Sequence, residues 1–93
     1  MAIQDMQQLT SMVAAVSKTF VVYSKPGCPS CVNAKQLIAL SGDVYIENVI
    51  GRDVSREDFM EMFPAVKSVP YILEQDAGAI GGFDNLVEWY ENK

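Results

Sequence analysis

The sequence contains no histidine, only two cysteines, and fewer cationic than acidic side chains. A structural zinc site needs four ligands, and a single cysteine pair cannot supply them within one chain. Only a site shared between chains could therefore hold zinc. Seven Lys and Arg against twelve Asp and Glu give a formal net charge of −5. Because affinity for nucleic acid depends on clustered cations, we expect no nucleic-acid partner.

Long apolar runs are also missing. No segment reaches the length of a membrane span, and the N-terminus lacks the cationic stretch and unbroken apolar run of a secretory signal. The 93 residues, of which 49% are hydrophobic and 20% charged, have the composition of a soluble globular protein with one modest core. We expect a single domain over residues 1–93, in the cytoplasm, with no membrane partner. No repeat, linker or low-complexity tract divides the chain.

Both cysteines lie in the stretch SKPGCPSC, residues 24–31. A disulfide between Cys28 and Cys31 would close so small a loop that it would restrain the unfolded chain little. The spacing instead favours a redox dithiol. The alternative, two small buried hydrophobic residues, does not explain a proline between them.

The first half of the chain predicts a βαβ unit. Residues 19–24, TFVVYS, and 44–50, VYIENVI, read as strands, and the crossover between them is long enough for parallel pairing. Pro29 suits the first position of a helix that ends at Ser41-Gly42. Cys28 is then the N-cap, and Cys31 lies one turn inside. An earlier amphipathic helix is predicted over residues 3–16.

The second half predicts two further helices and a strand pair. The elements are a short helix begun by Ser55 that buries Phe59, Met62 and Phe63, strands over 71–75 and 79–82 around an Asp76-Ala77-Gly78 turn, and a last helix over 85–92 capped by Asp84. The acidic run from Asp53 to Glu61 reads as a solvated helix face. The remaining large aromatic side chains are assigned to the core: Tyr23, Tyr45, Tyr71 and Trp89.

This order of elements, with SKPGCPSC after the first strand, SVP before the third and IGGFDNL after the fourth, resembles the glutaredoxin family of thioredoxin-fold proteins. The resemblance covers nearly the whole chain and is strongest to the small glutaredoxins of bacteria and bacteriophages. It implies an α/β fold with a four-stranded mixed sheet in the order 2-1-3-4. Helices would cover both faces, and the predicted N-terminal helix would be an addition.

The cysteines can be given separate roles. The helix N-terminus and Lys25 both favour a thiolate at Cys28, which we predict to be the nucleophile. Cys31, predicted to face the sheet, would be the resolving thiol. Ser30 stands where similar proteins usually have an aromatic residue. Either its hydroxyl hydrogen-bonds a cysteine sulfur or it is a solvated loop residue.

The resemblance also implies a glutathione groove. Ser68, Val69 and Pro70 match the family's TVP motif, whose proline is cis, although most X-Pro bonds are trans. The backbone of Val69 would pair with glutathione or an extended peptide. The other glutathione contacts implied are Lys25 at the glycyl carboxylate and Gly82, Phe83, Asp84 and Asn85 at the γ-glutamyl end. Lys67 or Arg52 could help at the carboxylate, although a solvated surface is the default interpretation of these two residues. Many relatives have Ser or Thr followed by Asp where this chain has Asp84 and Asn85.

The resemblance thus implies a monomeric, glutathione-dependent thiol–disulfide oxidoreductase without a metal. It would reduce protein disulfides with both cysteines and glutathione mixed disulfides with Cys28 alone. Its partners would be glutathione, glutathionylated or disulfide-containing proteins and, by family analogy, ribonucleotide reductase. Two alternatives stay open. A thioredoxin reductase could supply the electrons, or the chain could be a non-enzymatic dimer that binds a [2Fe–2S] cluster through Cys28 and glutathione, against which Pro29 counts.

Overall fold

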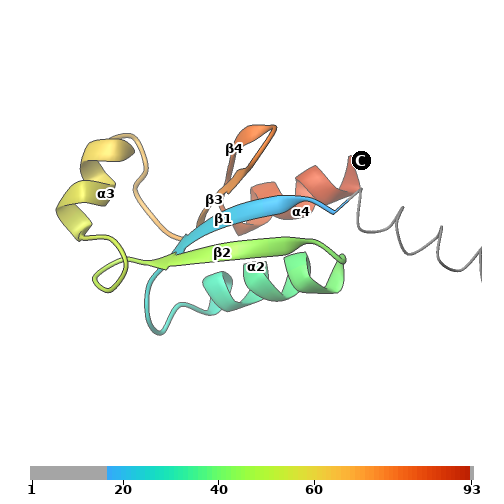
Figure 1. Cartoon of the computed structure of the whole chain (residues 1–93), viewed down its shortest axis with the longest axis horizontal. Coiled ribbons are helices and arrows are strands. Elements are labelled where there is room, and N and C mark those ends of the chain that lie inside the picture. Colours follow the sequence, from blue (N-terminus) through green and yellow to red (C-terminus); the bar gives the residue numbers. More distant parts are fainter. Residues whose placement is uncertain (1–16, 93) are drawn as a thin grey trace, which may run out of the picture.

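The computed structural model describes residues 17–92. The elements in chain order are strand β1 (Thr19–Ser24), helix α2 (Pro29–Leu40), strand β2 (Val44–Val49), helix α3 (Arg56–Met62), strand β3 (Tyr71–Glu74), strand β4 (Gly78–Gly81) and helix α4 (Phe83–Glu91), as Figure 1 shows. The helix predicted over residues 3–16 lies outside the described residues.

The four strands form one mixed sheet in the order β2-β1-β3-β4. Strand β1 pairs parallel with β2 and antiparallel with β3, and β3 pairs antiparallel with β4. The parallel pair is joined through helix α2, as the crossover length predicts. The predicted strand order is therefore confirmed.

Helices α2 and α4 pack on one face of the sheet, and α3 meets the other face at one end, because side chains alternate along each strand. On one face, Phe20 and Val22 of β1 pack with Ala34 and Ile38 of α2 and Leu86 of α4 in the main core. On the other face, Tyr23 and Tyr71 contact the aromatic rings that α3 and its C-terminal end supply. The site edge of the sheet is thus held between α2 and α3.

Helix α2 begins and ends as its sequence predicts. Pro29 occupies the first turn with Cys28 as N-cap, and Gly42, at φ 82°, provides the left-handed residue that follows the helix. Ser55 is the N-cap of α3 and accepts the N–H of Asp58. None of the helices in residues 17–92 is long and apolar enough to cross a membrane.

Three sequence predictions about burial and capping were wrong. Met62 is 49% exposed because the short helix α3 buries only Phe59, and Tyr45 is 38% exposed because β2 is an edge strand. Helix α4 begins at Phe83, with Gly82 as N-cap, so Asp84 lies inside its first turn.

Candidate active site

The two cysteines form a disulfide at the junction of β1 and α2. Their Cα atoms are 5.3 Å apart, a separation that the first helical turn sets. The backbone N–H of Cys31 donates to Cys28 Sγ at 3.2 Å, which is an N-cap hydrogen bond with sulfur as acceptor. Cys28 is 8% exposed and Cys31 2% exposed. Solvent therefore reaches Cys28 more readily than Cys31. This difference fits Cys28 as the nucleophile and Cys31 as the resolving thiol.

The start of β3 lies against the disulfide. The Val69-Pro70 peptide is cis, as the resemblance implied, and Pro70 is buried. The carbonyl oxygen of Val69 lies 3.9 Å from Cys28 Sγ. A segment some 40 residues away in the sequence thus presents its backbone beside the reactive sulfur.

The start of α4 adjoins this segment. A Cβ atom placed on Gly82 would lie 3.7 Å from the carbonyl oxygen of Pro70. The N–H of Gly82 donates to Asn85 Oδ1 at 3.0 Å, so Asn85 folds back over the N-cap residue Gly82, and the predicted cap at Asp84 is wrong. Gly81, at φ 120°, has no room for a side chain, since a Cβ would lie 2.5 Å from Asn85 Oδ1. Its glycine is explained by the cap rather than by a ligand.

The predicted groove residues divide into two sets. Cys28, Val69, Pro70 and Gly82 are connected by the contacts above, and Lys25 and Ser68 line a hollow with Val69. Phe83 instead packs against the core, while Asp84 is exposed in the first turn of α4. Ser30 is exposed, and its hydroxyl bonds neither sulfur among the described residues, which favours the solvated alternative.

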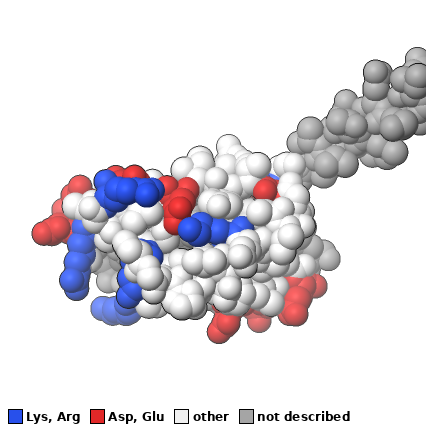
Figure 2. All heavy atoms as spheres, turned by 90° about the horizontal axis from the view of Figure 1, so that it is seen from below, with Lys and Arg blue, Asp and Glu red and all other residues white. Residues whose placement is uncertain are grey.

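Two hollows flank the disulfide. One, of about 580 Å³, runs from Lys25 and Val69 toward α3 and includes Arg56 and Lys67. The other, of about 560 Å³, contains both cysteines, with Lys35, Glu47 and Arg52 on its wall. Figure 2 shows Lys and Arg side chains gathered mostly over the left-hand part of the molecule, where α3 lies in Figure 1. The site edge is thus rich in cations although the chain is acidic.

A polar network that the sequence did not reveal lies in the second hollow. Ser24 Oγ donates to Glu47 Oε2 at 2.6 Å, and Lys35 Nζ forms an ion pair with the same oxygen at 2.8 Å. The hydrogen bond from Lys35, followed by that from Ser24, lowers the pKa of Glu47 below its ordinary value. Glu47 remains a carboxylate near the cysteines at neutral pH. The network could not be predicted from the sequence because it depends on the pairing of β2 with β1, which places Glu47 opposite Val22.

Within residues 17–92, no cluster of three or more His, Cys, Asp or Glu side chains is arranged to hold a metal ion. The described residues place two sulfur atoms at this site, with backbone and charged groups around them.

A disulfide at the N-terminus of a helix, beside a cis-proline strand in a 2-1-3-4 sheet, defines a thiol–disulfide oxidoreductase of thioredoxin-like fold. The model of the family Glutaredoxin matches residues 20–74, more than half of the chain. The chain belongs to the glutaredoxin family.

Solved structures of glutaredoxins share this fold. Reduced glutaredoxin from Escherichia coli is 28% identical, with a TM-score of 0.60 over 81% of this chain and 95% of that one. Glutaredoxin 1 from Francisella tularensis, complexed with cacodylate, is 24% identical, with a TM-score of 0.64 over 83% of this chain and 100% of that one. A buckwheat glutaredoxin–glutathione complex is 23% identical, with a TM-score of 0.60 over 92% and 78%. Among curated protein sequences, no relative matches the chain.

Proposed function

We propose that the protein is a glutathione-dependent oxidoreductase that reduces protein disulfides with both cysteines and glutathione mixed disulfides with Cys28 alone. The observation that carries the proposal is the pairing of Cys28, at the N-cap beside the Val69 carbonyl, with the more buried Cys31. In the reduced protein, the N–H of Cys31 and the positive end of α2 would stabilise a thiolate at Cys28.

Reduction of a protein disulfide takes two exchanges. The Cys28 thiolate attacks one substrate sulfur, the substrate S–S bond breaks, and the released thiolate takes a proton. Cys31, as thiolate, then attacks Cys28 Sγ and releases the second substrate thiol. The substrate gains two electrons and two protons, and the Cys28–Cys31 disulfide described above is the oxidised product.

Glutathione would restore the dithiol in two further exchanges. The first glutathione thiolate attacks Cys28 Sγ, which frees Cys31 and leaves glutathione bonded to Cys28. The second attacks the sulfur of that bound glutathione, so that glutathione disulfide leaves and Cys28 returns as a thiolate. The proposal is supported by the neighbouring buckwheat structure, a complex with glutathione, by the Val69 carbonyl beside Cys28, and by Lys25, which lines the hollow that contains Cys28.

The biological setting belongs to the same proposal. A cytoplasmic monomer would meet both glutathione and disulfide-containing clients there, and ribonucleotide reductase is a client by family analogy only. The half-buried Val69, whose carbonyl oxygen lies beside Cys28, supports clients that bind in an extended conformation.

The test is a coupled NADPH assay on a small glutathione mixed disulfide. One arm contains glutathione and glutathione reductase, and the other contains a thioredoxin reductase alone. We expect turnover in the glutathione arm. Turnover only in the second arm would keep the dithiol chemistry but refute the glutathione groove, and no turnover in either would refute the enzyme assignment.

The cysteine roles are tested in the same assay. Cys28→Ser should abolish reduction of every substrate, because no nucleophile remains. Cys31→Ser should spare turnover of the glutathione mixed disulfide and abolish reduction of protein disulfides that need the second exchange. Equal losses of activity on the glutathione mixed disulfide from the two substitutions would contradict the assignment of nucleophile and resolving thiol.

A further inference from the structure

The hollow on the α3 side of the disulfide, here called the α3 groove, has an apolar floor. Its apolar lining consists of Ile50, Phe59, Met60, Pro64 and Val66. The groove begins at Val69, whose carbonyl oxygen lies 3.9 Å from Cys28 Sγ, and it leads away from the cysteines toward α3. Any chain bonded to Cys28 and extended in this direction would lie over the groove.

Three cationic side chains line the α3 groove: Lys25, Arg56 and Lys67. None of them forms an ion pair within residues 17–92, where the two ion pairs use Lys35 and Arg52. The two hollows together include five of the seven Lys and Arg of a chain with net charge −5. Cations without partners are therefore concentrated where a substrate would approach.

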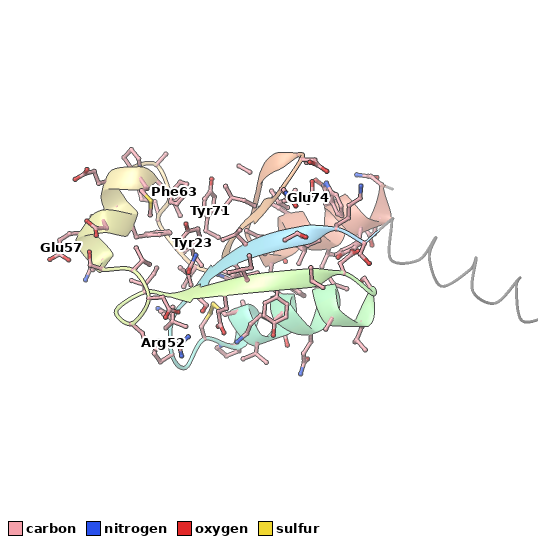
Figure 3. The ribbon with its side chains drawn as sticks, viewed as in Figure 1. Tyr23, Arg52, Glu57, Phe63, Tyr71 and Glu74 are labelled. Carbon is pink, nitrogen blue, oxygen red and sulfur yellow. A yellow bond between two sulfur atoms is a disulfide. The ribbon has the colours of Figure 1, made fainter. Side chains whose placement is uncertain are left out.

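Helix α3 separates its charges between two sides. Arg56, Phe59 and Met60, at spacings of three and four, line the groove. The acidic residues of the same helix, Glu57, Asp58 and Glu61, do not line it, and Figure 3 shows Glu57 at the outer end of α3, away from the sheet. The acidic run of the sequence therefore leaves the groove itself positive.

We propose that the α3 groove binds an acidic, extended segment that flanks the reactive cysteine of a protein disulfide client. The inference rests on the proposed function and names the class of client. An extended chain advances about 3.3 Å per residue with alternating side chains. The first few residues beyond the client cysteine would thus pass Ser68 and Lys67. Their carboxylates would meet Arg56 and Lys67, while apolar side chains between them would meet Phe59 and Met60.

The test compares peptide disulfides that differ only in charge. Each peptide has the same internal disulfide, flanked on both sides by two Glu or by two Gln residues. Reduction by the reduced protein is followed by acid quenching and chromatography. We expect the second-order rate constant to be roughly three- to tenfold higher for the Glu peptide at low salt, since exposed ion pairs and electrostatic steering act together. About 0.5 M salt should remove most of the preference.

Charge-matched variants locate the effect. The double variant Arg56→Gln/Lys67→Gln should reduce the Glu/Gln rate ratio to about one, and each single variant should give an intermediate ratio. Lys18→Gln is the control, because Lys18 precedes β1 and lines neither hollow. It should retain the wild-type ratio.

The outcomes separate the two proposals. Equal rates on the two peptides, with the small glutathione mixed disulfide still reduced, would overturn the groove assignment alone. So would a preference that survives in the double variant as it does in Lys18→Gln. Failure to reduce any of these substrates would overturn the proposed function and the inference with it.

Discussion

Glu47 is the residue whose environment most directly links the edge of the sheet to the cysteines. It accepts hydrogen bonds from Ser24 and Lys35, and all three side chains line the hollow that contains Cys28 and Cys31. Ser24 is buried and needs this partner, because an unpaired buried hydroxyl is unfavourable. The network thus fixes the end of β1, from which the active-site loop leaves.

The lowered pKa of Glu47 predicts a pH-dependent stability. The hydrogen bonds from Lys35 and Ser24 favour the carboxylate in the folded state, so its stabilisation is complete above the unfolded pKa near 4.5 and is lost as the pH falls through the lower folded pKa. Relative to Glu47→Gln, we expect the wild type to be more stable by about 0.5 kcal/mol at pH 7. Urea unfolding at pH 7 and at about pH 3 should show this advantage disappear.

Lys35 and Arg52 provide a matched pair for the same measurement. Lys35→Met should raise the pKa of Glu47, followed by NMR, because Lys35 contributes most to its lowering. Arg52→Met should change it much less, since Arg52 is paired with Asp53 and acts on Glu47 only at long range. Equal shifts in the two variants would show that the ion pair does not set the pKa.

Residues governed by local rules could be predicted from the sequence, and residues governed by distant contacts could not. Pro29, Gly42 and Ser55 follow helix-terminus chemistry that involves only their neighbours, so their places were predicted correctly. Glu47 and Arg56 gain their surroundings from strand pairing and from the packing of α3, which no local pattern encodes.

At the scale of elements, the β3–β4 hairpin depends on a buried glutamate. Glu74 is 3% exposed, and its Oε1 accepts the N–H groups of Asp76 and Ala77 at 3.1 and 2.7 Å. Its Oε2 has no hydrogen-bond partner among the described residues. Figure 3 shows Glu74 beside the turn. The carboxylate closes the turn between the two strands.

Two substitutions at Glu74 test whether the stability of the turn depends on one acceptor oxygen. Glu74→Leu leaves two N–H groups of the turn without their acceptor, and we expect a loss of about 1–3 kcal/mol in the free energy of unfolding. Glu74→Gln keeps one acceptor oxygen and should retain most of the stability. Gln75→Leu, at the exposed neighbouring position, is the control. Urea unfolding gives the free energy of unfolding of all three variants. Equal losses in Glu74→Leu and Glu74→Gln would contradict the role of Glu74 as acceptor for the turn.

The N-terminus of α4 could not be predicted from residue type alone. Asp84 is a good N-cap residue by type, but the close approach of Gly81 and Gly82 allows Asn85 to reach back to the N–H of Gly82. The helix therefore starts at Phe83. A preference of a residue type was overridden by a backbone conformation that only the folded hairpin creates.

At the scale of the whole molecule, one hydrogen-bonded carboxylate connects three distant parts of the chain. Asp43, in the turn after α2, accepts the backbone N–H of Lys18 at 2.8 Å and the hydroxyl of Tyr90 at 2.7 Å. It thereby links the residue before β1, the turn before β2 and the last helix, α4. This end of the sheet lies opposite the cysteines, so the connection concerns stability rather than catalysis.

Tyr90 makes this connection sensitive to alkaline pH. Burial, followed by its hydrogen bond to Asp43, raises the pKa of Tyr90 above the ordinary value. The folded state favours the protonated hydroxyl, so its stabilisation is complete below the unfolded pKa near 10 and is lost as the pH rises toward the folded pKa. We expect Tyr90→Phe to be less stable than the wild type by about 1 kcal/mol at pH 7.

Above pH 10 the difference should close, because only the wild type must keep this tyrosine protonated to fold. The expected change is about 1.4 kcal/mol per pH unit once the unfolded tyrosine ionises, enough to cancel the advantage of the wild type near pH 11. Urea unfolding of both proteins at pH 7, 10 and 11 tests this, with Tyr45→Phe as the control on the exposed edge strand. A difference that stays constant across this range would contradict the raised pKa of Tyr90. No difference at pH 7 would mean that the hydroxyl link to Asp43 contributes little and that Tyr90 acts through its ring against Phe20 and Trp89.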